Sequence, residues 1–349
     1  MRILYSLIRK EMLHLVRDTR TVVIAIIMPL VLLLLFGFAI STEVNNVRIA
    51  AVVERHNDAT ARILERFRVN PYFTFTGISD AAAVNSMMMR GETDAALLLR
   101  DDGGREVAQI IVDASNTVVA QSATMYIQGV LQEAGTGSPV TVRTLYNPQL
   151  KSAYNFVPGI MGMIFILICA IMTSVSIVSE KETGTMNLLL VSPVKPGTIV
   201  FGKLVPYFLL SCVILAVMLT MAYTVLGLPV SRSVFTVVAV SLLYIVLSLA
   251  IGLLVSTLVS SQVAALIVSA VVFMIPVIML SGMIFPVDNM PLPLQFVSGI
   301  IPARWYISAM RKLMIQQLPL HYILQELAVL GVMTLGILAM AIRKFNSKR

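Results

Sequence analysis

Gly197 to Lys203 is the stretch whose spacing comes nearest to a site for chemistry. It reads Gly-Thr-Ile-Val-Phe-Gly-Lys, which fits the first seven positions of a phosphate-binding loop. The eighth position, where Ser or Thr would hold Mg²⁺, is Leu204, and the residues between the two glycines are bulky. No predicted strand precedes the stretch, and a long apolar run follows it. We therefore interpret the match as a coincidence and expect no ATP site on this chain.

The other residue types that could do chemistry are scattered. The histidines and cysteines are His14, His56, His321, Cys169 and Cys212. They share no metal-ligand spacing, and both cysteines lie in apolar runs, where packing thiols are favoured over a disulfide. No Gly-x-Ser-x-Gly or His-Glu-x-x-His motif occurs. We expect no catalytic residue, cofactor or metal on this chain.

Composition indicates a multi-span membrane protein. Of 349 residues, 58% are hydrophobic and 13% are charged, and the mean hydropathy is +0.88. Soluble domains have roughly 25% charged residues. The net charge of +8 includes no basic stretch interleaved with aromatic residues, so nucleic-acid binding is excluded.

Six apolar runs approach or exceed the length of about 20 residues that a membrane span needs. They are 21–40, 156–178, 204–226, 234–258, 263–285 and 323–342. The first is too long for a signal-peptide core and lacks small residues at a cleavage position, so we interpret it as a retained helix. These runs contain no Asp or Glu except Glu326, whereas ion-driven transporters usually carry carboxylates there. Energy for transport would therefore come from a partner.

Basic residues set the predicted orientation. They gather before the first span, between the second and third spans, and after the sixth, which places all three groups on one side. The positive-inside rule makes this side cytoplasmic. Both termini and residues 179–203 are then cytoplasmic, and residues 41–155 are external.

Two hydrophobic segments are predicted not to span. Residues 1–20 carry apolar positions at helical spacing with cations elsewhere, which predicts an amphipathic helix on the inner leaflet rather than a plain cytoplasmic tail. Residues 286–319 are apolar but interrupted by prolines, which predicts an external re-entrant helical hairpin, with a simple external loop as the alternative. Trp305 and Tyr306 are expected to anchor it at the interface.

Residues 41–155 alternate between strand and helix patterns. Strands are predicted at 47–53, 72–76, 95–99, 107–112 and 140–145, and helices at 58–67, 80–90 and 116–134. This alternation predicts a small α/β domain. The fold class is thus an α-helical integral membrane protein with six transmembrane helices, an N-terminal amphipathic helix, an external re-entrant hairpin and an inserted external α/β domain. Residues 156–349 hold spans two to six.

Several short motifs resemble a known family. They are Glu180-Lys181-Glu182, Gly184-Thr185, Leu189-Leu190-Val191-Ser192-Pro193-Val194, Gly202-Lys203, Lys10-Glu11, Arg17-Asp18-Thr19-Arg20-Thr21 and Tyr146-Asn147-Pro148. Jointly they resemble the signature of type-2 ATP-binding-cassette (ABC) exporter permeases of the multidrug-resistance-like branch. The resemblance covers essentially the whole chain.

The resemblance implies a coupling segment at residues 179–203 that rests in a groove of a separate ABC ATPase subunit. Its coupling residues are Glu180, Lys181, Glu182, Thr183, Gly184, Thr185, Leu189 and Pro193, and the membrane-surface helix supplies Arg9, Lys10, Glu11, Arg17, Asp18 and Arg20. We expect Glu180 and Glu182 at a helix N-terminus, a turn at Gly184, and an end at Pro193. A plain solvated loop is the alternative.

The same resemblance implies the partners and location. They are the ATPase with its ATP and Mg²⁺, a second permease copy in a homodimer or heterodimer, the lipid bilayer of a bacterial inner membrane, and a periplasmic adaptor as a further candidate. The expected activity is export of a hydrophobic or amphiphilic compound. Export of an ion, glycan or peptide by the same family, or a membrane-anchored sensor with an external ligand-binding domain, are the alternatives.

Overall fold

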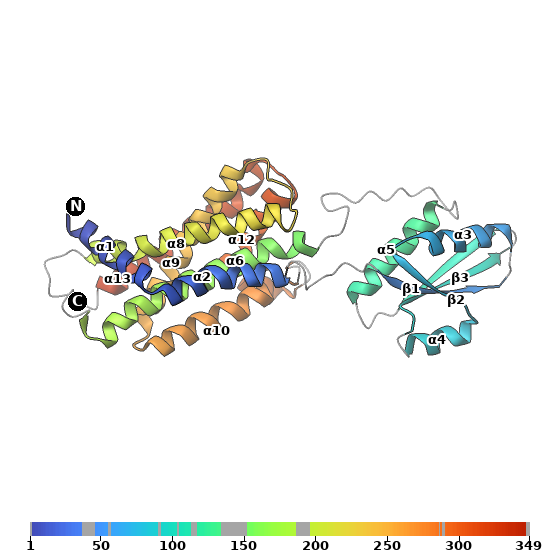
Figure 1. Ribbon diagram of the computed structural model, residues 1–349, viewed down its shortest axis with the longest axis horizontal. Coiled ribbons are helices and arrows are strands. Elements are labelled where there is room, and N and C mark those ends of the chain that lie inside the picture. The colour runs from blue at the N-terminus through green and yellow to red at the C-terminus, as the bar shows by residue number, and fades with distance from the viewer. Residues whose placement is uncertain are drawn as a thin grey trace. The chain divides into compact units, whose positions relative to one another are not determined.

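A computed structural model describes residues 2–36, 46–54, 57–89, 92–102, 105–112, 117–133, 152–185, 196–285, 287 and 290–346. Contacts divide the chain into two units (Figure 1). The helical unit comprises Met1–Ile40 and Ser152–Arg349, and the α/β unit comprises Ser41–Lys151. Each unit has its own hydrophobic core.

The helical unit is built from long apolar helices and several short elements. They are α1 (Arg2–Arg17), α2 (Thr19–Leu34), α6 (Ser152–Glu182), α8 (Pro196–Thr224), α9 (Val234–Leu258), α10 (Gln262–Leu280), α11 (Leu292–Ile300), α12 (Pro302–Met310), the π-helical turn η3 (Arg311–Ile315), the 3₁₀ turn η4 (Leu320–Ile323) and α13 (Leu324–Asn346). α6, α8, α9, α10 and α13 are long and apolar enough to cross a membrane. The prediction of a helical membrane protein is confirmed at this level. α2 has a shorter apolar stretch, Thr21–Leu34, and the rest of the predicted first span lies largely outside the described residues.

Several helices have bounds that differ from those of the predicted spans. α6 continues past Val178 to Glu182, α8 begins at Pro196 rather than Leu204, and α10 ends at Leu280 rather than near Phe285. Charged residues can continue a helix beyond its apolar stretch, because the backbone hydrogen bonds do not depend on the polarity of the side chains. Segment 179–203 is therefore helical at both ends.

α6 and α9 form the centre of the helical unit. Gly252 of α9 lies so close to α6 that a Cβ atom there would stand 2.8 Å from the Ala170 carbonyl oxygen. Tyr244 and Tyr306 stack beside this crossing with ring centroids 4.2 Å apart, and both are fully buried. The Tyr244 hydroxyl donates a hydrogen bond to the Gly162 carbonyl oxygen of α6, at 2.9 Å. The close backbone approach and the Tyr244 hydrogen bond join α6 to α9, and the aromatic stack joins α9 to α12, which contains Tyr306.

The predicted hairpin contains two short helices, α11 and α12, which meet at Ile301. The Trp305 indole donates a hydrogen bond to the Gly299 carbonyl oxygen, which ties the two helices. The predicted interfacial role of Tyr306 is wrong, because its ring is in the core and its hydroxyl lies 3.1 Å from Ser241 Oγ. A tyrosine can be buried when its hydroxyl finds such a partner. Whether the hairpin re-enters a membrane stays a prediction, and Pro286 lies outside the described residues.

The α/β unit has a four-stranded sheet of order β2-β1-β3-β4 (Figure 1). Its elements are β1 (Val47–Val53), α3 (Asp58–Val69), β2 (Phe73–Ile78), α4 (Ala81–Met89), β3 (Ala95–Asp102), β4 (Arg105–Val112) and α5 (Thr117–Glu133). β1 pairs in parallel with β2 and β3, and β4 is antiparallel to β3. One core joins the sheet to α3 and α5, and a smaller cluster joins it to α4. The predicted strands and helices in this unit are confirmed, except the strand at 140–145, which lies outside the described residues.

Candidate functional site

The N-terminal helix and α2 meet at Asp18. α1 ends at Arg17, so the predicted amphipathic helix is three residues too long. Asp18 is the N-cap of α2: its carboxylate accepts hydrogen bonds from the Thr21 backbone N–H at 3.2 Å and from the Thr21 hydroxyl at 2.5 Å. A carboxylate at this position stabilises the start of a helix. The Asp-x-x-Thr part of the opening motif therefore fixes the corner between α1 and α2.

α1 packs along the beginning of α8. A Cβ atom on Gly202 would lie 3.0 Å from the Leu7 Cβ atom, so glycine is what permits this approach. Glu11 and Leu15 are also on the buried face of α1, and Glu11 is 6% exposed. Arg9 and Arg17 are exposed, and the side chain of Arg20 is outside the described part of the chain.

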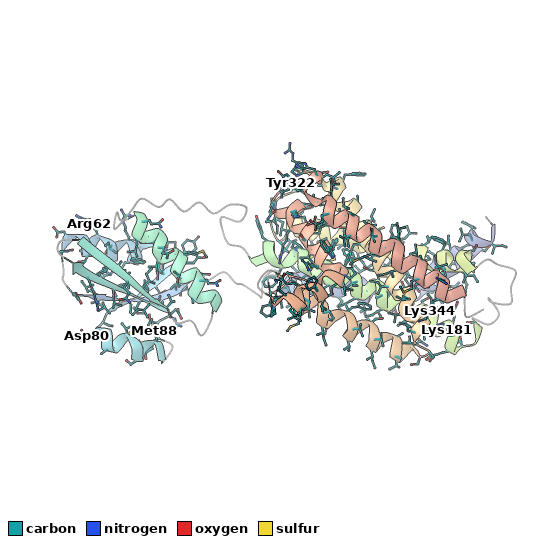
Figure 2. All side chains as sticks on the ribbon, turned by 180° about the vertical axis from the view of Figure 1, so that it is seen from behind. Arg62, Asp80, Met88, Lys181, Tyr322 and Lys344 are labelled. Atoms are coloured by element: carbon teal, nitrogen blue, oxygen red, sulfur yellow. The ribbon has the colours of Figure 1, made fainter. Side chains whose placement is uncertain are left out.

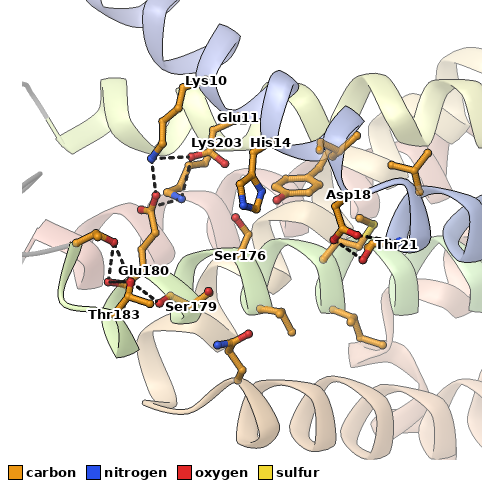
Figure 3. A pocket seen from close by; sticks show the side chains of 18 of the residues that line it. Lys10, Glu11, His14, Asp18, Thr21, Ser176, Ser179, Glu180, Thr183 and Lys203 are labelled. Atoms are coloured by element: carbon orange, nitrogen blue, oxygen red, sulfur yellow. Dashed lines mark hydrogen bonds and ion pairs between the residues drawn. The ribbon is translucent and has the colours of Figure 1, made fainter.

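Lys10, Glu11, Glu180 and Lys203 form an ion cluster that joins α1, α6 and α8 (Figure 3). Lys203 Nζ lies 3.3 Å from Glu11 Oε1 and 2.8 Å from Glu180 Oε2. Lys10 Nζ lies 2.9 Å from Glu180 Oε1 and 3.6 Å from Glu11 Oε1. Each lysine therefore contacts both carboxylates, and each carboxylate contacts both lysines.

The cluster is buried on one side and open on the other. The side chains of Lys203 and Glu11 are only 5% and 7% exposed, whereas that of Lys10 is 56% exposed. Burial lowers the pKa of the Lys10 ammonium, but the hydrogen bond and charge of Glu180 raise it by more, so the net direction is upward. The pairing thus keeps Lys10 charged.

Residues 180–182, the Glu-Lys-Glu triplet, contact helices in three directions. Glu180 reaches α1 and α8 through the ion cluster. Lys181 donates a hydrogen bond to the Ser256 carbonyl oxygen, near the end of α9. Glu182 accepts hydrogen bonds from the Gln262 backbone N–H at 2.9 Å and from the Gln262 amide at 2.5 Å, at the start of α10, whose N-cap is Ser261. The end of α6 is therefore bonded to four other helices.

The triplet belongs to the last turn of α6, so the prediction that Glu180 and Glu182 begin a helix is wrong. A carboxylate is unfavourable at the negative end of its own helix, and here other charges compensate for it. Glu180 is paired with two lysines, and Glu182 lies at the amino-terminal, positive end of α10.

Thr183 and Gly184 form the turn that follows α6, and Thr185 is again helical. Gly184 has φ of +72°, a left-handed conformation that favours glycine after a helix. The Thr183 hydroxyl donates to the Ser179 carbonyl oxygen at 3.0 Å, and that of Thr185 donates to the Glu180 carbonyl oxygen at 3.2 Å. The predicted turn at Gly184 is thus present. Leu189 and Pro193 lie outside the described residues.

Sequence reasoning missed the pairing of Lys203, which it interpreted as an anchor at a helix start. Lys203 lies two turns inside α8 and is buried. A signal was present, because a lysine in a long apolar helix needs a partner, and Glu11 and Glu180 were among the four carboxylates of residues 1–20 and 179–203, which were predicted on the same side. The bonds from Lys181 to α9 and from Glu182 to α10 had no such signal, since backbone acceptors and donors leave no mark in a sequence.

The glycine-lysine stretch does not have the geometry of a phosphate-binding loop. Gly197–Lys203 is helical, so its backbone N–H groups do not form a phosphate cradle. Among the described residues, no group of three or more His, Cys, Asp and Glu side chains could hold a metal ion. Figure 2 labels Lys181 and Lys344 at one end of the helical unit and Tyr322 at the other. The basic ends of α6 and α13 therefore lie at the same end of the unit.

These features define a multi-span membrane protein in which the charged end of α6 is bonded to four other helices. A family model, the ABC-2 family transporter protein, matches residues 19–343. The chain belongs to this family of ABC transporter permeases.

Named relatives match over most of their length. The chain is 31% identical to "Probable multidrug ABC transporter permease YbhR" of Escherichia coli strain K12, over 95% of both chains. It is 28% identical to "Probable multidrug ABC transporter permease YbhS" of the same strain, over 87% of this chain and 86% of that one. It is also 26% identical to "ABC transporter G family member 20" of Dictyostelium discoideum, over 52% of this chain and 25% of that protein.

Proposed function

We propose that this permease is the membrane half of an ATP-driven exporter of hydrophobic or amphiphilic compounds. A separate ABC ATPase supplies the energy, and two permease copies pair to form the path. The end of the helical unit that carries the Glu-Lys-Glu triplet faces the cytoplasm, the α/β unit is external, and the bacterial inner membrane is the location. Membership of the ABC-2 family supports this proposal, as do the two Escherichia coli relatives, which are named as probable multidrug permeases.

The observation that carries the proposal is the set of contacts made by the triplet. An ATPase that pushes on the segment after α6 would move Glu180, Lys181 and Glu182 together. Their bonds would pass the displacement to α1, α8, α9 and α10 at once. Rigid helices joined in this way can move as one body. A plain solvated loop would not need such contacts.

Co-purification tests the proposal. The full-length permease, solubilised from native membranes, should bring down an ABC ATPase and a second permease copy. The presence of the permease should also stimulate ATP hydrolysis by the ATPase. Recovery of the permease alone, with no nucleotide-dependent partner, would favour the sensor alternative.

Two substitutions test the coupling residues. Glu182→Ala removes the carboxylate that accepts two hydrogen bonds from Gln262 at the start of α10, each worth about 1 kcal/mol, and should reduce stimulated ATP hydrolysis and export together. Glu182→Gln keeps an oxygen acceptor for the Gln262 backbone N–H and should lose less. Gly184→Pro forbids the observed positive φ and should uncouple, while Gly184→Asn tolerates it and should not. If Glu182→Ala and Gly184→Pro both export normally, the coupling assignment is wrong.

A further inference from the structure

A cavity lies beside the ion cluster, inside the helical unit. It has a volume of about 570 Å³ and is lined by side chains from α1, α2, α6, α8 and α10 (Figure 3). Small-molecule sites commonly have volumes of about 300–1,000 Å³. The cavity is therefore large enough for a drug-sized molecule within a single permease copy.

The cavity has an apolar wall and a polar one. The apolar side chains that line it are Leu15, Val22, Ile171, Met172, Val175 and Leu266. The polar groups include the hydroxyls of Thr21, Ser176, Ser179 and Tyr207. This combination suits a ligand with a flat or branched hydrocarbon body and one polar group.

The charges of the lining favour a cation. Two lysines, Lys10 and Lys203, face three carboxylates, those of Glu11, Asp18 and Glu180. Both lysine Nζ atoms already contact Glu11 and Glu180, so an added anion would have to compete with these carboxylates. Asp18 already occupies the amino-terminal end of α2, which would otherwise attract an anion. In Figure 3 Asp18 and the ion cluster stand at opposite ends of the cavity, with His14 and Ser176 between them.

We propose that this cavity is a binding site for an amphiphilic organic cation, with the positive group toward Asp18 and the apolar body against α6 and α10. As a binding site the proposal stands on the cavity alone. As a site for cargo it rests on the proposed export function. A ligand in this cavity touches α1, α6 and α10, and the Glu-Lys-Glu triplet bonds these three helices to one another. Binding of the ligand would therefore act directly on the helices that the triplet connects.

Binding of rhodamine 6G, a fluorescent amphiphilic cation, to the full-length permease in lipid nanodiscs tests the proposal. Val175→Trp fills the cavity and should weaken binding by about tenfold or more. Val272→Trp is the matched control, because Val272 is 53% exposed on α10 and does not line the cavity. It should leave affinity within about twofold.

Asp18→Asn tests the charge without removing the cap of α2, because Asn caps helices as well as Asp does. It should weaken rhodamine 6G binding by about fivefold, as expected for a partly exposed ion pair. It should leave binding of Nile red, a neutral dye of similar shape, within about twofold. An equal effect on both dyes, or no effect of Val175→Trp, would overturn the proposal. ATPase stimulation, measured in the same preparations, separates the two claims: stimulation without cavity binding refutes this site alone, and cavity binding without stimulation refutes the proposed function alone.

Discussion

Replacing Lys203 by Met should free α1 from the rest of the helical unit. Lys203 is 5% exposed in its side chain and is the only lysine of the ion cluster that is buried. Met keeps most of the apolar stem and removes the ammonium group. Glu180 would retain Lys10 at 2.9 Å, but Glu11, 7% exposed in its side chain, would keep only the more distant Lys10 at 3.6 Å.

The expected cost follows from the burial of Glu11. Removing one partner of a buried ion pair costs about 3–5 kcal/mol, since a charge is left without compensation. The remaining contact with the exposed Lys10 returns up to about 1 kcal/mol. We therefore expect a net loss of about 3 kcal/mol, which raises the equilibrium constant for local opening of α1 roughly a hundredfold.

Hydrogen exchange of the α1 backbone amides measures this opening without global unfolding. The exchange should accelerate in α1 and at the start of α8, and remain unchanged in the α/β unit. Lys10→Met is the matched control, because its side chain is 56% exposed, and it should change exchange by less than about fivefold.

A compensating substitution sharpens the test. In the double variant Lys203→Met, Glu11→Leu, the buried carboxylate of Glu11 is removed together with the ammonium group of Lys203. Glu180 keeps Lys10 as its partner. It should restore most of the lost protection, as replacing a buried ion pair by apolar residues often does. If Lys203→Met opens α1 no more than Lys10→Met, or if the double variant is worse than the single one, the ion cluster does not hold α1.

Two further predictions concern packing and pH. Gly252→Leu should lower the melting temperature of the purified permease sharply, because overpacking costs about 1–3 kcal/mol and α9 has no room for a side chain there. Gly336→Leu is the control, because nothing lies within 4 Å of a Cβ atom at that position, and it should leave the melting temperature unchanged. In the α/β unit, burial raises the pKa of Asp94 but hydrogen bonds from Arg48 lower it by more, so the net direction is downward. The stability from this pair is present above the ordinary value of about 3.8 and is lost as the pH falls through the lower folded value. Arg48→Met should therefore speed hydrogen exchange in β1 at neutral pH, and its difference from the parent should shrink below about pH 4; a difference that grows in acid would refute the pairing.

Long uninterrupted apolar runs made the helical unit predictable. The predicted span 234–258 matches α9 residue for residue, because Ser233 caps its start and the sequence after Leu258 is a turn. The ends of α6 and α8 were not predictable, since their charged residues are compensated by partners far away in sequence. Tyr306 was misplaced for the same kind of reason: its core position depends on Ser241 and Tyr244, which only the fold brings near it.

The candidate site was predicted in composition but not in geometry. The motif residues Lys10, Glu11, Glu180 and Lys203 were all singled out from the sequence, yet as separate features. Their association needs α1 to lie on α8, which depends on the absence of a side chain at Gly202. The bonds of the Glu-Lys-Glu triplet likewise depend on the end of α6 lying beside α9 and α10, which only the fold brings near it.

Contact between the end of α6 and an ATPase is the central claim, and site-specific crosslinking measures it directly. A photo-crosslinking amino acid at Thr183, which is exposed, is compared with one at Arg232, which is also exposed and lies in the connection between α8 and α9. In native membranes the Thr183 probe should crosslink to an ABC ATPase subunit, more strongly in one nucleotide state than another, and the Arg232 probe should not. Crosslinking from Arg232 and none from Thr183 would contradict both the coupling role and the assigned orientation.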